Sequence, residues 1–176
     1  NIKKKLLSEN SITRPFSYYG KGKLKIERLL KKNIENKKLI ILRLPGVFGG
    51  KGNYPGIIDK IIFSIKNKKA FTMYSRGNEL RDYVYCKDIS KIIRFILSNK
   101  FVSQKINIIN FVKGKSLSIN EKIKIIETYL NKKLILKFNI QSNKSGHQIF
   151  NNSKFIKFSA GKFRFINLED YLNKIT

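Results

Sequence analysis

The chain has 176 residues, which is long enough for one domain with a hydrophobic core and short for two. Its 38 basic and 11 acidic residues leave a net charge of +27, but 31 of the basic residues are lysines spread along the whole chain. Without a basic block or an aromatic stacking pattern, this charge disfavours a nucleic-acid-binding module and still favours an anionic small molecule as ligand.

Targeting signals and metal-ligand patterns are missing from the sequence. No apolar run approaches the roughly 18 residues of a membrane span, and the N-terminus has no apolar stretch of signal-peptide length. We therefore expect a cytoplasmic protein that does not contact a membrane. Cys86 is the only cysteine and His147 the only histidine, so the sequence predicts neither an internal disulfide nor a metal site.

The first predicted elements are a helix, a strand and a loop. Ser17 can cap a helix that ends in the polar run before residue 39, and the apolar residues 39–44 then predict a parallel strand covered on both faces. The following segment contains Gly46, Gly49, Gly50 and Gly52. We expect it to be a loop whose backbone can approach a ligand closely.

The rest of the sequence alternates helical and extended patterns. Helices are predicted at 55–67, 88–97, 118–130 and 168–172, and strands at 71–74, 83–86, 106–110 and 134–138. Ser118 and Glu121 form a capping box, Gly77 marks a turn, and a polar tail precedes the last helix. This alternation predicts one unit of α/β character, and its start on a helix suggests that strands of a doubly wound sheet precede it.

Tyr19 and Lys23 are the first candidates for chemistry. They are four residues apart, which places them on one face of the first predicted helix. Ionising a phenol at neutral pH requires about 4 kcal/mol, and an ammonium ~4 Å away supplies about that much at an effective dielectric near 20. The pair could therefore exchange a proton with a substrate, although the same spacing is typical of ordinary helix surfaces in a chain with 8 tyrosines.

Three segments in one order carry a family resemblance. Residues 15–23 read PFSYYGKGK with Glu27 one turn later, residues 41–49 read ILRLPGVFG, and residues 77–88 read GNELRDYVYCKD. Together they resemble the extended short-chain dehydrogenase/reductases, the NAD-dependent nucleotide-sugar epimerases and dehydratases. Tyr18 is set aside as the family's tyrosine because its fourth neighbour is Gly22, not a lysine.

The resemblance implies roles for six residues. Tyr19 would be the acid/base that exchanges a proton with a sugar hydroxyl during oxidation to a keto sugar, and Lys23 would assist it and hold the nicotinamide ribose. Arg81 would bind the diphosphate of the substrate, because a guanidinium suits phosphate oxygens. Three residues would lie beside the nicotinamide ring of NAD: Pro45, Gly46 and Val47.

The resemblance also implies the fold and its extent. Residues 1–176 would be the C-terminal part of a doubly wound Rossmann-type parallel sheet with a small mixed α/β subdomain, and substrate would contact residues 45–88 and 111–176. The dinucleotide fingerprint belongs to an N-terminal half that these residues do not include, so we expect this chain alone to be inactive. A nucleotide-diphosphate sugar and, through the tyrosine-bearing helix, a homodimer are the expected partners.

Departures from the family pattern leave other functions open. Gly46 stands where an asparagine is usual, Cys86 is interpreted as a small core residue, and Ser8, Ser11 and Thr13 are interpreted as loop residues. A noncatalytic remnant that binds sugar nucleotides is therefore one alternative. A basic nucleic-acid-binding domain, suggested by the charge alone, is a less favoured one.

Overall fold

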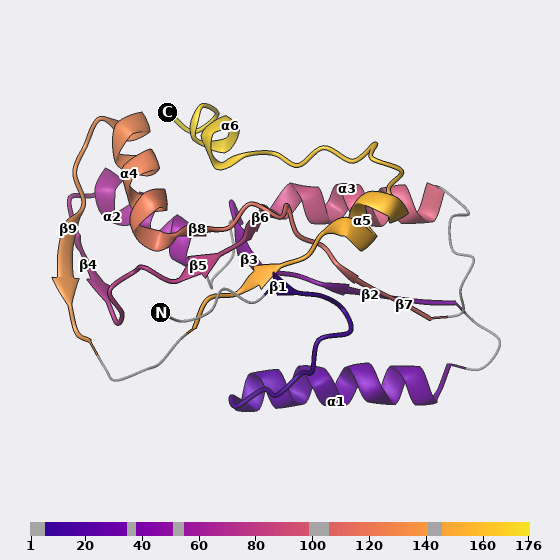
Figure 1. Ribbon diagram of the computed structural model, residues 1–176. Coiled ribbons are helices and arrows are strands. Elements are labelled where there is room, and N and C mark those ends of the chain that lie inside the picture. The colour runs from indigo at the N-terminus through magenta and orange to yellow at the C-terminus, as the bar shows by residue number, and fades with distance from the viewer. Residues whose placement is uncertain (1–5, 35–37, 51–54, 99–105, 141–145) are drawn as a thin grey trace.

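The fold is a mixed α/β arrangement in which pairs of strands pack with helices (Figure 1). The computed structural model describes residues 6–34, 38–50, 55–98, 106–140 and 146–176. Four pairs are parallel: β1 (Leu6–Leu7) with β10 (Ile149–Phe150), β2 (Leu39–Arg43) with β7 (Ile106–Asn110), β3 (Gly46–Phe48) with β6 (Tyr83–Tyr85), and β4 (Ala70–Met73) with β9 (Ile135–Phe138). β5 (Leu80–Arg81) and β8 (Leu117–Ser118) pair in antiparallel fashion.

The helices cover these strands in two groups (Figure 1). α1 (Tyr18–Lys32) lies on one side of β2 and β7, and α3 (Cys86–Ser98) and α5 (Ser153–Phe158) lie on the other. α2 (Ile57–Lys66), α4 (Ile119–Leu130) and α6 (Leu168–Leu172) gather at the end of the molecule that carries β4 and β9. The predicted α/β class with parallel strands is confirmed.

Local signals in the sequence set the helix starts. The Ser17 side chain accepts from the backbone N–H of Gly20 at 3.1 Å, and Ser118 and Glu121 form a complete capping box at the start of α4. Both caps satisfy backbone donors that the first helical turn leaves unpaired. The turn predicted at Gly77 is also present, with a φ of +73° that glycine adopts without strain.

The segment after β2 corrects one prediction. The loop expected from Gly46 begins only at Gly49, because residues 46–48 form strand β3 and pair with β6. Gly46 is needed for this pairing, since a Cβ there would lie 2.3 Å from Cε1 of Tyr83. β2 itself is half-buried at every residue, not fully covered as predicted, and Gly52 lies outside the described residues.

Two hydrophobic cores hold the elements together. One lies between α2, α4 and α6 and is centred on the fully buried Ile61, Ile126 and Leu172. The other joins β6, β7, α3 and α5 through Ile92, Phe111 and other apolar residues, and Ile40 and Leu42 of β2 pack against it. The second core therefore anchors β2 from the face opposite α1, so that the carboxyl end of β2 has a fixed position next to the tyrosine-bearing helix.

Candidate active site

The predicted pair occupies the first turn and a half of α1. Lys23 Nζ lies 5.4 Å from the centroid of the Tyr19 ring, so the two side chains share one side of the helix as the spacing predicted. Gly20 allows Pro15 to lie against this turn, because a Cβ at Gly20 would be 2.8 Å from Cβ of Pro15. Tyr19 as a whole is 76% exposed, so a substrate can reach its side chain from solvent.

A second tyrosine–lysine pair stands beside the first. Lys21 Nζ lies 5.7 Å from the centroid of the Tyr18 ring, which is a contact between residues three apart. Tyr18 has no lysine four residues on, but Lys21, three residues on, contacts its ring. What separates the two pairs in the structure is the surroundings of the lysines, because Lys23 lines a cavity and Lys21 does not.

The cavity beside Lys23 has a volume of about 470 Å³. It lies between the N-terminal segment, α1 and the carboxyl ends of β2 and β7, and its walls include Ser11, Thr13, Lys23, Glu27, Arg43 and Asn110. This volume falls within the range of roughly 300–1,000 Å³ that is usual for small-molecule sites. Ser8, Ser11 and Thr13, which were interpreted as loop residues, do lie outside helices and strands and form part of this wall.

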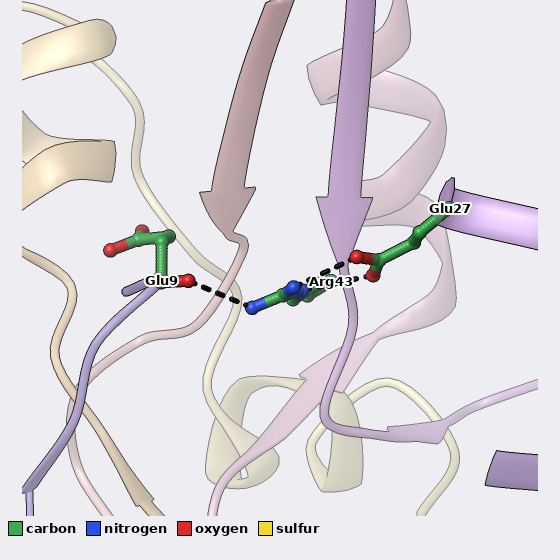
Figure 2. A network of polar contacts seen from close by, with 3 residues as sticks. All are labelled: Glu9, Glu27 and Arg43. Atoms are coloured by element: carbon green, nitrogen blue, oxygen red, sulfur yellow. Dashed lines mark hydrogen bonds and ion pairs between the residues drawn. The ribbon is translucent and has the colours of Figure 1, made fainter. Parts of the chain in front are cut away.

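An ion pair fastens α1 to the end of β2 (Figure 2). Arg43 Nε and Nη2 donate to the two carboxylate oxygens of Glu27 at 2.9 and 2.8 Å, and Arg43 Nη1 donates to the backbone carbonyl of Glu9 at 3.1 Å. The hydrogen bonds from Arg43 lower the pKa of Glu27, and the carboxylate raises the pKa of Arg43 in return. A bidentate pair of this kind fixes orientation as well as distance.

Glu9 extends the same network to β7. Its carboxylate accepts from the backbone N–H of Asn110 at 2.8 Å, and the Asn110 side-chain amide donates to the carbonyl of Leu7 at 3.3 Å. The N-terminal segment is therefore held across the carboxyl ends of both β2 and β7. Sequence reasoning identified Glu27 as part of the motif but gave no function to Arg43 or Glu9, because their contacts join residues up to 101 positions apart.

The predicted cofactor and substrate residues lie around a neighbouring cavity of about 220 Å³. Pro45, Gly46 and Arg81 line it, together with Gln148 and Phe150, which also line the cavity beside Lys23. The two cavities thus share a wall. Val47 does not take part, because its side chain packs against the core that contains Ile92 and Phe111.

Arg81 is held by backbone carbonyls from two segments. Its Nη1 donates to Leu80 at 2.9 Å and to Gly146 at 2.6 Å, and burial lowers the pKa of its guanidinium. His147 fixes the same segment, since its Nδ1 accepts from the backbone N–H of Leu80 at 3.1 Å. The histidine therefore has a visible structural contact beside Arg81.

Other titratable groups near the site have structural contacts. Cys86 Sγ donates to the carbonyl of Gly49 at 3.0 Å, and burial raises the pKa of the thiol, which disfavours the thiolate needed for a nucleophile. Burial likewise raises the pKa of Asp59, although the Gly49 N–H opposes this by donating to its carboxylate. Within the described ranges, no group of three histidine, cysteine, aspartate or glutamate side chains is placed to hold a metal ion.

A comparison with protein families decides the relationship. Residues 2–110, which include the pair on α1, the Pro45 segment and the Arg81 segment, match the NAD dependent epimerase/dehydratase family. The chain belongs to this family. No helix in the described part of the chain is long and apolar enough to cross a membrane.

Two relatives have named activities. The chain is 28% identical over 130 residues to the N-acetyl-alpha-D-glucosaminyl-diphospho-ditrans,octacis-undecaprenol 4-epimerase of Escherichia coli O157:H7, an alignment that covers 72% of this chain and 38% of the relative. It is 30% identical over 118 residues to dTDP-D-glucose 4,6-dehydratase of Dictyostelium discoideum, covering 66% of this chain and 27% of the relative. The chain thus corresponds to well under half of either relative.

Solved structures of the same fold cover nearly the whole chain. The complex of MoeE5 with UDP-glucuronic acid and NAD superposes with a TM-score of 0.83 at 20% identity, over 96% of this chain and 57% of that one. The UDP-glucuronic acid 4-epimerase of Bacillus cereus with UDP-glucuronic acid and NAD gives 0.81 at 22%, over 99% and 58%. At these identities the likeness establishes the Rossmann-type fold.

Proposed function

We propose that this epimerase/dehydratase chain supplies the acid/base pair and the substrate-binding surface of an enzyme that epimerises or dehydrates nucleotide-diphosphate sugars with NAD. The observation that carries the proposal is the position of Lys23. Its ammonium lies 5.4 Å from the Tyr19 ring centroid, and its side chain also lines the cavity of about 470 Å³. Lys23 therefore connects a solvent-accessible phenol to a space that can hold a ligand.

The chemistry follows from this arrangement. Tyr19 takes the proton of a sugar hydroxyl as the carbon that bears it is oxidised, and returns the proton when the keto sugar is reduced. Lys23 stabilises the phenolate that forms in between, because an ammonium ~4 Å from a phenolate oxygen contributes about 1 kcal/mol in water and about 4 kcal/mol at an effective dielectric near 20. A bound substrate that excludes water from the pair would move it toward the second value.

The residues present fit the nicotinamide end of NAD. The cavity beside Lys23 is large enough for a small-molecule group, and the lysine can donate to ribose hydroxyls. Pro45 and Gly46 line the adjoining cavity and are available to contact the same ligand, whereas Val47 would act through packing. When bound, NAD would accept a hydride from the sugar carbon and return it later in the cycle.

Arg81 defines the class of substrate. It lines the cavity that shares Gln148 and Phe150 with the cavity of Lys23, so a ligand that spans both would place a diphosphate beside a guanidinium and its sugar beside the catalytic pair. An apolar cavity of about 410 Å³ beside Phe71, Met73 and Tyr74 of the predicted substrate segment could accept the flat face of a nucleobase. The combination favours a nucleotide-diphosphate sugar over a simple sugar phosphate.

The binding proposal is tested by calorimetric titration of UDP-glucose at physiological salt, which screens nonspecific attraction to the basic surface. Replacing Arg81→Lys removes the bidentate donor and is expected to weaken binding about tenfold, or about 1.4 kcal/mol. Arg76→Lys is the matched control, because Arg76 is exposed in the neighbouring turn and lines none of these cavities. Equal affinities for the two variants would refute the assignment of Arg81.

We also propose that the functional protein is a homodimer formed through α1. No residue of α1 is fully buried, and Ile26, Leu29 and Leu30 each expose about half of their surface. Such apolar area on one helix is typical of an interface. Sedimentation velocity is expected to show that the parent protein is a dimer and that Leu30→Asp dissociates it. Leu97→Asp, a change on the exposed end of α3, is the control and should leave the dimer intact. A monomeric parent protein would rule the proposal out.

A further inference from the structure

A third polar cavity adjoins the cavity of Arg81, because Asp82 and Tyr83 line both. It has a volume of about 210 Å³ and lies between α2, α4, the segment after β7 and the segment before α6. Neither Lys23 nor Arg81 lines it. Its polar wall residues include three lysines and two acidic residues: Asp82, Lys113, Lys115, Lys122, Asn167 and Glu169.

Lys122 is the least expected of these residues. It is on the inner face of α4 and only 5% exposed, and its Nζ donates to the backbone carbonyls of Arg81 at 3.0 Å and Leu117 at 2.5 Å. The ammonium also lies 4.9 Å from the centroid of the Tyr83 ring. An ammonium has three N–H donors, so one remains beyond the two bonds to carbonyls.

No carboxylate in the described residues forms an ion pair with Lys122. Asp82 is buried nearby, but its Oδ1 accepts from the backbone N–H of Tyr83 at 2.8 Å and its Oδ2 from that of Gly114 at 2.7 Å. Burial lowers the pKa of Lys122 to about 8. The charge of Arg81 lowers this pKa further, whereas the charges of Asp82 and Glu121 oppose the shift. A buried ammonium without a contacting counter-ion is unfavourable.

The other two lysines of the cavity, Lys113 and Lys115, are less buried than Lys122. Lys113 Nζ donates to Asn167 Oδ1 across the cavity wall, and Lys115 is exposed at the rim. Glu169 is the second carboxylate of the lining and reduces the local charge without cancelling it. The cavity thus keeps an excess of positive charge, and its volume is below the range of roughly 300–1,000 Å³ for larger organic ligands.

We propose that this cavity binds a small oxyanion, either free inorganic phosphate or sulfate or a phosphate group of similar size, with Lys122 as its central donor. The anion would accept the third N–H of Lys122 and provide the counter-ion that the fold does not. Lys113 and Lys115 would contribute charge from the two sides of the cavity. The site shares Asp82 and Tyr83 with the cavity of Arg81, but its lysines line neither that cavity nor the cavity of Lys23, so separate substitutions can distinguish the two sites.

The test is thermal unfolding at pH 7 with chloride replaced stepwise by phosphate at constant ionic strength. A specific site gives a saturable rise in Tm that follows ligand occupancy, on top of the general stabilisation by such anions that all variants share. We expect the saturable part in the parent chain and in Lys124→Met, an exposed lysine on the same helix. Lys122→Met is expected to lose it.

Two further variants make the result unambiguous. Lys115→Met leaves the core intact and is expected to weaken phosphate binding several-fold, which keeps the proposal testable if Lys122→Met does not fold. Arg81→Lys is expected to leave the phosphate response unchanged while weakening UDP-glucose, so the two sites fail separately. A saturable response that survives in both Lys122→Met and Lys115→Met, or no saturable response in the parent chain, would overturn the proposal.

Discussion

At the scale of single residues, two adjacent tyrosines at the start of α1 each lie beneath a lysine. Lys21 is 5.7 Å from the Tyr18 ring centroid and Lys23 is 5.4 Å from that of Tyr19, so distance alone does not select one pair. The selection comes from the cavity, which only Lys23 lines. The spacing predicted that Tyr19 and Lys23 share one side of the helix, as the structure shows, but a sequence cannot show a cavity formed by segments far apart in the chain.

Gly46 gives a sharp prediction about packing. A Cβ at this position would lie 2.3 Å from Cε1 of Tyr83, so Gly46→Ala is expected to lower the free energy of unfolding by about 1–3 kcal/mol through overpacking. Gly50→Ala is the control, since a Cβ there meets no atom within 4 Å. Chemical denaturation of the two variants measures the difference, and equal stabilities would show that Tyr83 moves aside without cost.

The buried Lys122 should make the stability of the fold rise with pH in the alkaline range. Its pKa of about 8 in the fold lies below the ordinary 10.5, so the unfolded chain binds more protons between these values and stability rises with pH there. Relative to Lys122→Met, the parent chain should gain on the order of 2 kcal/mol between pH 7.5 and 10.5, after allowance for solvent screening. If the free energies of unfolding of the two proteins changed in parallel over this pH range, the lowered pKa of Lys122 would be contradicted.

At the scale of elements, the network of Glu27, Arg43 and Glu9 attaches α1 and the N-terminal segment to the ends of β2 and β7 (Figure 2). α1 has no fully buried residue, so these polar contacts carry a large share of its attachment. Tyr19 and Lys23, the proposed catalytic pair, are one to two turns before Glu27 on the same helix. The position of Tyr19 relative to the cavity therefore depends on this ion pair.

Replacing Arg43→Met is expected to loosen α1 selectively. Backbone amides of α1 should exchange with solvent about tenfold faster, while those of β7 change little, because the second hydrophobic core still holds that strand. Lys133→Met is the control: it removes an ion pair whose lysine is 88% exposed and should alter α1 very little. Uniform acceleration in all elements would indicate general destabilisation instead.

The same ion pair has a defined pH window. The pKa of Glu27 in the fold lies below its ordinary value of 4.5, so its contribution is complete above that value and is lost as the pH falls through the lower, folded value. Glu27→Gln should therefore be less stable than the parent chain by about 1 kcal/mol at pH 7, and this difference should shrink as the pH falls below 4.5. A difference in stability that stays constant as the pH falls below 4.5 would point to packing instead of charge.

The elements that sequence reasoning found are those with local signals. Capping residues marked α1 and α4, and apolar runs marked β2, β4, β7 and β9 within one or two residues. The two-residue strands β1, β5, β8 and β10 and the short helix α5 were missed, since each depends on tertiary pairing and has no periodicity of its own. Two of these, β5 and β10, carry the walls around Arg81, so this part of the site could not be derived from sequence.

At the scale of the whole molecule, family membership and fold agree while the chain covers only part of its relatives. It spans 57% of the MoeE5 chain and 38% of the E. coli 4-epimerase. Its sequence has no counterpart of the dinucleotide fingerprint, so we propose that these residues alone bind NAD weakly and turn over no substrate. The net charge of +27 would still attract anionic nucleotides from solution.

The central claim is that Tyr19, and not Tyr18, faces the bound substrate. The most direct measurement is nuclear magnetic resonance of the chain with ¹³C-labelled tyrosines during titration with UDP-glucose and NAD, with Tyr19→Phe and Tyr18→Phe assigning the two signals. We expect the Tyr19 signal to shift with saturation while the Tyr18 signal stays within the change seen for other exposed tyrosines. A saturable shift of Tyr18 alone, or no shift of Tyr19 at concentrations where binding is complete, would contradict the account.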